Sequence, residues 1–524
     1  MHFDLPYERA EQILSGMTLE QKVGQMLMAS IEVTEMDERT RAFLKENCVG
    51  NVILFGKNCS DRQQLVRLNH EIQDEITRNT GVQAILSIDQ EGGGVTRLRR
   101  GATVFPCAMA VGATGDPENA YLAGHMMGNE MRELGIYFDC APVLDVNVSN
   151  DDPIVGRRSY GETWQETALY GGAFAKGLRD AGIIDCGKHF PGEGYARQDT
   201  HFDFVTQDIP RETIVNEFVA AFRETIKHGL RAVMITHIYY SALDPDGYPA
   251  SLSAPVIQGL LRKDLGFEGL VISDGLQMLS IADRYGAPRG AVLAAKAGCD
   301  LLIIGNGGDN ATPDGEDAQT PCVQALLQAV KSGELPIERV EEAARRVIAF
   351  KLAMGDMRPN EKVLERDWRA HEAFSRALSK MSVTVERNRK HLLPLPKHAL
   401  FLSRISRARL GVEEGDKLVD GFAPMAARLL DGEAMEYQNL PDMEAIKDKI
   451  AAAPAVVVGI TSKTECLEMV ETLQKIYALN EKLCVVCMDA PYILKFVPFV
   501  PCAISSYDQT VNAIRAVCEA LEGK

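Results

Sequence analysis

Short apolar runs alternate with longer amphipathic segments through the first three-fifths of the chain. Runs of this length, bounded by Gly, Pro or Asp, are typical of buried parallel strands, and apolar positions spaced three and four apart are typical of helices. The runs are Val23–Ala29, Val49–Phe55, Ala84–Asp89, Phe138–Val146, Ile183–His189, Ala232–His237, Leu270–Asp274 and Asp300–Gly305. The helical segments include Gln63–Arg78, Pro117–Leu134, Trp164–Ala181, Glu212–His228 and Gly290–Ala297.

These strand–helix units predict an α/β protein built on a (β/α)₈ barrel of the TIM type. A doubly wound open sheet is the competing architecture. Such a sheet normally carries a glycine-rich phosphate turn after its first strand. No G-x-G-x-x-G pattern follows Val23–Ala29, so the barrel is favoured.

The chain has 524 residues and continues well beyond the expected barrel. After the helical segment Glu338–Met354, a run rich in helix breakers spans 355–360 and is typical of a linker. Further apolar runs alternate with helical segments and predict a smaller α/β domain; they are Ala399–Leu402, Ala455–Ile460, Leu483–Met488 and Ala503–Ser506. We therefore expect a barrel over 1–355, a linker and helix over 356–380, and a C-terminal α/β domain over 381–524.

Charge narrows the classes of partner. Lys and Arg total 56 against 73 for Asp and Glu, a net charge of −17. An anionic protein repels nucleic acids and anionic membranes, so we expect neither as a partner.

The first thirty residues lack a secretory signal pattern, and no stretch reaches the roughly 18 apolar residues of a membrane span. With most of the 12 cysteines in apolar segments, a cytoplasmic protein is expected.

Polar residues terminate several of the predicted strands. Asp89, Lys188-His189, His237 and Asp274 all stand at such positions. Active sites of (β/α)₈ barrels lie at the carboxyl ends of their strands, so these side chains are predicted to share one rim. Each alone could instead cap a helix or be a structural histidine. Without H-E-x-x-H, paired C-x-x-C or a Walker loop, neither a metal nor a cofactor is expected.

The segment 188–201 is the most specific feature of the chain. It reads Lys-His-Phe-Pro-Gly-Glu-Gly, then a short gap, then Asp-Thr-His. It resembles the catalytic loop of family 3 glycoside hydrolases, in the bacterial β-N-acetylglucosaminidase (β-hexosaminidase) branch of cell-wall recycling. It departs from that branch at Glu193, where a histidine is usual. The resemblance covers the whole barrel and extends to the two-domain form, with matches at Met17–Met26, Asp89–Gly93, Ala141–Val146, Gly156–Tyr160, Ala297–Asp300, Ser382–Val385 and Leu392–Leu395.

The resemblance implies a retaining glycoside hydrolase that removes terminal β-linked N-acetylglucosamine, followed by a C-terminal α/β sandwich. It assigns Asp274 as the nucleophile that forms a covalent glycosyl-aspartate. A carboxylate suits this role because it is anionic at neutral pH and can leave again in the second step. His201 would be the acid/base, oriented by Asp199, since imidazole titrates near neutrality. The residues that it implies for sugar binding are Asp89, Arg97, Arg158, Lys188 and His189.

Three alternatives remain open at this level. The chain could be an N-acetylglucosaminide phosphorylase or a β-glucosidase of the same family, or an inactive sugar-binding protein. Gly94, Glu193 and Gly275 depart from the branch's pattern, and Gly275 replaces the Trp typical of β-glucosidases. Glu193 could pair with Lys188 or Arg197, or raise the pKa of the acid/base by like charge. The expected substrate is a small carbohydrate, such as a muropeptide-derived glycoside.

Overall fold

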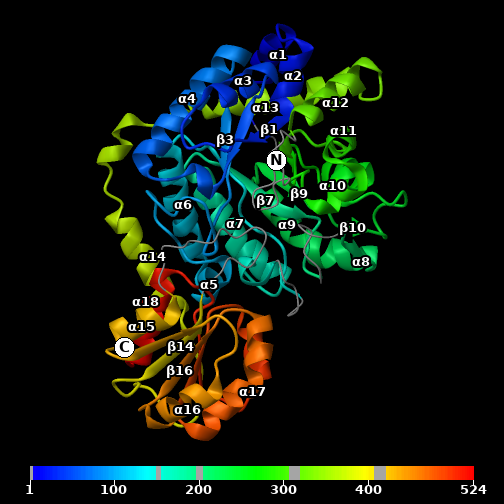
Figure 1. Ribbon diagram of the computed structural model, residues 1–524. Helices are drawn as coiled ribbons and strands as arrows, with labels where there is room; N and C mark the ends of the chain where they lie inside the picture. Colours follow the sequence, from blue (N-terminus) through cyan, green and yellow to red (C-terminus); the bar gives the residue numbers. More distant parts are fainter. Residues whose placement is uncertain (1–3, 149–154, 196–203, 306–318, 406–420) are drawn as a thin grey trace.

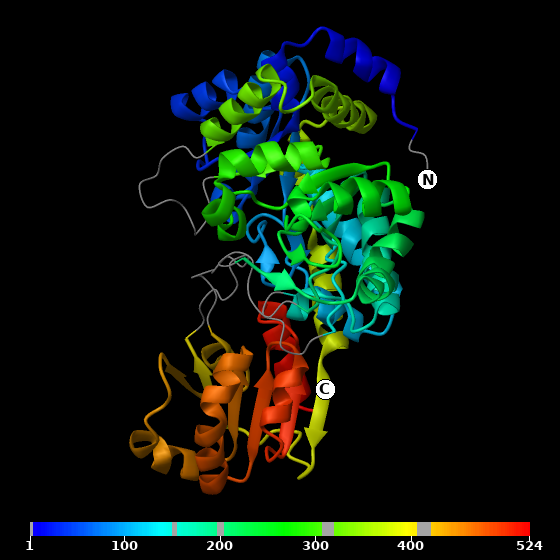
Figure 2. The ribbon, with the colours of Figure 1, turned by 90° about the vertical axis from the view of Figure 1, so that its right-hand side faces the viewer.

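The computed structural model describes residues 4–148, 155–195, 204–305, 319–405 and 421–524. It contains a barrel and a smaller domain, which lies below the barrel in Figures 1 and 2. Across the described ranges, every helix is too short or too polar to span a lipid bilayer.

A ring of eight parallel strands forms the barrel. They pair in the order β11-β9-β7-β6-β3-β2-β1-β12, and a bridge between Ile272 and Leu301 joins the two ends. The predicted (β/α)₈ architecture is therefore confirmed. The strands are β1 (Leu27–Ser30), β2 (Asn51–Leu54), β3 (Ile85–Ile88), β6 (Phe138–Asp139), β7 (Ile184–Phe190), β9 (Ala232–Ile235), β11 (Leu270–Ser273) and β12 (Leu302–Ile304).

Helices surround these strands and bury their apolar faces against them. Side-chain caps set where several of them begin: Asp61 accepts the Gln64 N–H, and Thr163 forms a capping box with Glu166. The main surrounding helices are α3 (Glu38–Glu46), α4 (Arg62–Thr80), α6 (Pro117–Glu133), α7 (Trp164–Asp180), α9 (Val219–Lys227), η5 (Pro255–Asp264), α11 (Ala287–Ala297), α12 (Gln319–Lys331) and α13 (Ile337–Met354). Short helices α1 (Tyr7–Ser15), α5 (Ala108–Ala113) and α10 (Leu279–Tyr285) complete this layer.

The bounds of the predicted barrel strands differ from those of the structure by one or more residues, and two strands differ most. The first was expected from Val23, but helix α2 (Leu19–Met26) occupies that stretch because a Thr18–Gln21 capping box starts it. Val23 and Met26 are buried at helical spacing, so one apolar run spans a helix and a strand. The fourth was expected to reach Val146, but β6 ends at Asp139. Pro142 has no N–H to continue the ladder.

The smaller domain is a six-stranded sheet with helices on both faces. Its order is β13-β18-β17-β16-β14-β15, with β13 antiparallel to β18 and the other pairs parallel. The strands are β13 (Thr384–Asn388), β14 (Leu400–Arg404), β15 (Glu433–Tyr437), β16 (Val456–Ile460), β17 (Leu483–Cys487) and β18 (Cys502–Ser505). The helices are α15 (Phe422–Leu429), α16 (Met443–Ala452), α17 (Lys463–Leu479), η8 (Pro491–Phe496) and α18 (Val511–Leu521).

The carboxyl ends of β17 and β18 face the barrel. Arg157 donates to the Met488 carbonyl at 3.3 Å, and the Cys107 N–H donates to Asp508 at 3.0 Å. Helix α14 (Arg369–Ser382) runs along the side of the barrel towards the smaller domain (Figure 1). Near its start, His371 Nδ1 lies 2.7 Å from Glu130 Oε1 of the barrel helix α6. The two parts of the chain therefore meet through specific polar contacts.

Candidate active site

Six of the predicted site residues lie around the carboxyl ends of the barrel strands. Asp89 follows β3, Lys188 and His189 end β7, and Asp274 follows β11. Arg97 follows the hairpin of β4 (Gln90–Gly92) and β5 (Val95–Thr96), and Arg158 closes the short helix η2 (Gly156–Arg158). Parallel strands place their carboxyl ends on the same face of a barrel, so residues far apart in sequence converge.

Lys188 is the centre of a buried ion-pair cluster. Its Nζ lies 2.7 Å from Asp89 Oδ1 and 2.7 Å from Glu91 Oε1. Arg158 donates two hydrogen bonds to Glu91, from Nε at 2.8 Å and from Nη2 at 2.7 Å. Arg97 Nη2 lies 3.5 Å from Asp89 Oδ2. These five side chains therefore form one continuous network.

The network keeps its members charged. Burial alone would raise the pKa of Asp89, but Lys188 and Arg97 outweigh it and the pKa is lowered. Burial likewise opposes ionisation of Glu91, yet Arg158 and Lys188 lower its pKa far below the usual range. The pKa of Lys188 is raised in spite of burial, because Asp89 and Glu91 face it. Fixed charges at a barrel mouth can act as strong hydrogen-bond partners for a polyhydroxylated ligand.

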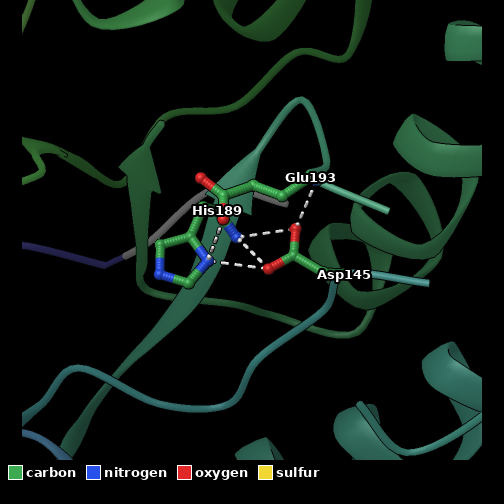
Figure 3. Close-up of side chains that lie close together, drawn as sticks. All are labelled: Asp145, His189 and Glu193. Carbon is green, nitrogen blue, oxygen red and sulfur yellow. Dashed lines mark hydrogen bonds and ion pairs between the residues drawn. The ribbon is translucent and has the colours of Figure 1, made fainter. Parts of the chain in front are cut away.

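A second buried group surrounds His189 (Figure 3). Its Nδ1 lies 2.7 Å from Asp145 Oδ2, and its backbone N–H also donates to Asp145, as does the Glu193 N–H at 2.9 Å. Glu193 Oε2 lies 3.9 Å from the same ring nitrogen, while its other oxygen contacts the Thr236 hydroxyl. The sequence offered Lys188 and Arg197 as ion-pair partners of Glu193. These contacts are with His189 and Thr236 instead of Lys188, and Arg197 lies outside the described residues.

Asp274 is less buried than its neighbours in sequence, and backbone N–H groups fix its position. Its own N–H donates to the Ile235 carbonyl at 3.2 Å, and the Gly275 N–H donates to its Oδ1 at 2.7 Å. His237, fully buried, contacts Ser251 Oγ through Nδ1 and the Gly275 carbonyl through Nε2. His237 therefore supports the turn that carries Asp274.

Asp145, His189 and Glu193 also have the residue types of a metal site. Among the described residues, their ligand atoms lie within 4.8 Å of one another. The contacts around Asp145 are those of a hydrogen-bonded network, because its oxygens accept three N–H groups of the protein. The structure accounts for these three side chains through hydrogen bonds.

Sequence reasoning located part of this site and missed two members. Asp199 and His201, the predicted acid/base pair, lie outside the described residues. Glu91 and Asp145 were not singled out, although Glu91 follows a predicted strand and Asp145 stands near the end of the predicted strand Phe138–Val146. Glu91 comes two residues after Asp89, and Asp145 ends the segment after β6, so position at the barrel mouth was the available signal.

Comparisons with known proteins agree on one family. The model of the glycosyl hydrolase family 3 N-terminal domain matches residues 18–350. A β-hexosaminidase of Vibrio cholerae is 34% identical over 312 residues, covering 59% of this chain and 91% of that protein. One from Neisseria meningitidis is 32% identical over 310 residues, covering 58% and 84%. The structure of a family 3 β-N-acetylglucosaminidase from Paenibacillus sp. FPU-7 covers 97% of both chains, with 32% identity and a TM-score of 0.87.

Proposed function

The chain belongs to glycosyl hydrolase family 3, and we propose that it removes terminal β-linked N-acetylglucosamine with retention, through a glycosyl-aspartate at Asp274. The relatives named β-hexosaminidase and β-N-acetylglucosaminidase support the sugar. The single observation that supports the mechanism best is the position of Asp274. It is the more accessible carboxylate at a mouth where Asp89, Glu91 and Asp145 are buried by their partners.

The reaction would proceed in two displacements. Asp274 attacks the anomeric carbon while an acid protonates the leaving oxygen, and the covalent ester forms as the glycosidic bond breaks. A water then attacks the anomeric carbon, gives up a proton to the same group acting as base, and releases Asp274. We propose His201, oriented by Asp199, for the acid and base roles. The Gly275 N–H bond would hold the Asp274 carboxylate in a fixed orientation.

The buried cluster would read the sugar's hydroxyl groups. Asp89 would accept hydrogen bonds and be kept ionised by Lys188 and Arg97, while Arg158 would do the same for Glu91; the three cations would also supply donors. His189 would add a donor or acceptor beside the cluster. Since these groups are already fixed by one another, little side-chain entropy is lost when the sugar binds. We further propose that the natural substrate is a glycoside derived from bacterial cell wall.

The test compares 4-nitrophenyl N-acetyl-β-glucosaminide with 4-nitrophenyl β-glucoside, with and without phosphate. Wild type should cleave the N-acetyl substrate with the better kcat/KM and yield free sugar. Asp274→Asn should lose kcat by about 10³-fold or more, since the nucleophile is removed. Asp283→Asn, a change on α10 well beyond the turn, is the matched control and should keep wild-type kcat.

Each other outcome selects an alternative. A phosphate-dependent rise in rate with sugar 1-phosphate as product would indicate a phosphorylase. Better cleavage of the glucoside would indicate a β-glucosidase. Binding of N-acetylglucosamine without turnover of either compound at any pH would indicate a sugar-binding protein.

A further inference from the structure

Glu193 occupies an unusual place beside the site. It is 1% exposed, and it stands four residues after His189 on the segment that follows β7. Its Oε2 lies 3.9 Å from His189 Nδ1, on the same side of the ring as Asp145. Two carboxyl groups therefore face one nitrogen of one imidazole, as Figure 3 shows.

Asp145 is fixed as a hydrogen-bond acceptor in this arrangement. Both of its oxygens accept the His189 backbone N–H at 3.1 Å, and Oδ1 also accepts the Glu193 N–H at 2.9 Å. Only the Nδ1–H form of His189 can donate to Asp145 Oδ2 at 2.7 Å. The remaining question is whether Nε2, on the edge of the ring directed away from both carboxyl groups in Figure 3, also carries a proton.

We propose that Glu193 is a positioning residue that, with Asp145, keeps the His189 ring doubly protonated, so that Nε2–H is a charged donor for a sugar hydroxyl. The donor part of this inference rests on the proposed sugar-binding role of His189. One imidazolium offsets one of the two negative charges that face it, at a buried position where the His189 side chain is 7% exposed. A histidine at position 193 would instead put a second cation beside the ring.

The surrounding charges agree with this assignment. Burial by itself lowers the pKa of His189, but Glu193 and Asp145 outweigh it and the pKa is raised, although Arg158 opposes them. Burial raises the pKa of Glu193, with Asp145 and Asp274 adding to it, while His189 and the Thr236 hydroxyl oppose the rise. The titrations of His189 and Glu193 are therefore linked. The carboxylate of Glu193 stabilises the imidazolium of His189, and the imidazolium stabilises the carboxylate.

The experiment is a titration of the full chain labelled with ¹⁵N-histidine, because nitrogen shifts report which ring atoms carry protons. His189→Gln identifies the His189 signals among the ten histidines. In wild type, both His189 nitrogens should be protonated at pH 7. In Glu193→Gln, which keeps the shape of the side chain, the midpoint for loss of the second proton should fall by about one to three pH units.

A matched control exists on the surface of the same protein. Glu224 and His228 have the same four-residue spacing, and Glu224 Oε1 lies 3.7 Å from His228 Nδ1, but both side chains are solvent-exposed. Glu224→Gln should leave the His189 titration unchanged. A neutral His189 in wild type at pH 7, or equal midpoints in wild type and Glu193→Gln, would overturn the proposal.

Kinetics then separates this inference from the proposed function. If the charged ring binds the sugar, KM of Glu193→Gln should match wild type within about twofold at pH 5.5 and exceed it by about tenfold at pH 8. A merely structural role would raise KM equally at both pH values and lower Tm, and that result would count against the proposal. A shifted His189 titration with an unchanged KM profile would confirm the effect of Glu193 on charge and refute the part played by Nε2–H in binding.

Discussion

At the scale of single residues, the site depends on charges that are stable only together. Lys188 is 1% exposed and holds both Asp89 and Glu91 at 2.7 Å. Removing one member of a buried ion pair leaves an uncompensated charge, whereas removing an exposed member changes little. The identity of residue 188 therefore matters to folding as well as to binding.

Lys188→Met should lower the free energy of unfolding by about 3–5 kcal/mol at pH 7. The deficit should shrink in acid. The pKa values of Asp89 and Glu91 are lowered in the folded protein, so their contribution is present above the unfolded pKa of about 4 and is lost as pH falls through their folded values. Urea unfolding at pH 7 and at successive pH values below 4 measures how the deficit shrinks.

The control for Lys188→Met is Lys176→Met on α7. Lys176 pairs with Asp180 at 2.5 Å, but its side chain is 59% exposed. Its loss should change the free energy of unfolding by no more than about 0.5 kcal/mol. Equal effects of the two substitutions would show that the Lys188 network contributes nothing beyond a surface pair.

At the scale of elements, the sequence predicted most strands but misplaced their ends. Apolar runs identify strands that are buried on both faces, such as β16 and β17, whose residues are all buried. The edge strands β13 and β15 were missed because most of their residues are exposed or half-buried and carry polar side chains. Lys188 and Asp89 could be placed at strand ends by pattern alone. The contacts of Glu91, Asp145 and Glu193 could not, since they depend on loops whose paths no periodicity describes.

The element η8 of the smaller domain reaches the loops of the barrel mouth. The Tyr492 hydroxyl lies 2.7 Å from Glu162 and accepts from Asn147 at 3.2 Å, and Asn147 stands two residues after Asp145. Asn147 is 2% exposed, so water does not readily replace a lost hydrogen-bond partner of its side chain. The smaller domain therefore supports the segment that carries Asp145.

Tyr492→Phe removes the hydrogen bonds to Glu162 and Asn147, so it should reduce stability by about 1–2 kcal/mol and should raise KM because Asn147 loses its partner. Tyr121→Phe removes a comparable bond to Asp180, 3.2 Å long, between α6 and α7 on the barrel wall. It should cost similar stability without changing KM. Thermal unfolding and initial rates on both variants test this, and an unchanged KM in Tyr492→Phe would exclude the supporting role.

At the scale of the whole molecule, the two ends of the barrel do different work. The carboxyl ends of the strands gather the charged network, while Val347 and Phe350 of α13 share one apolar cluster with strand residues such as Met28 and Ile85. Buried charged residues also lie at the opposite end of the barrel: Asp300, just before β12, pairs with Arg262, Arg339 and Arg346, and Lys351 is a second such residue. Lys351 of α13 is 2% exposed, and its Nζ donates to Gln25 Oε1 at 2.7 Å and to the Gly50 carbonyl at 3.0 Å.

Lys351 should make folding depend on pH far from the active site. Two neutral acceptors cannot offset the burial of an ammonium group, and burial lowers its pKa to about 7. Between pH 7 and its unfolded pKa of about 10.4, the unfolded chain binds more protons at this residue than the folded protein, so stability rises with pH. Relative to Lys351→Met, wild type should therefore gain up to about 1.4 kcal/mol of stability for each pH unit above 7. Urea unfolding of both proteins at pH 6, 7, 8 and 9 measures this difference, in which other titrating groups cancel. Parallel stability curves would mean that Lys351 keeps its proton in the folded barrel.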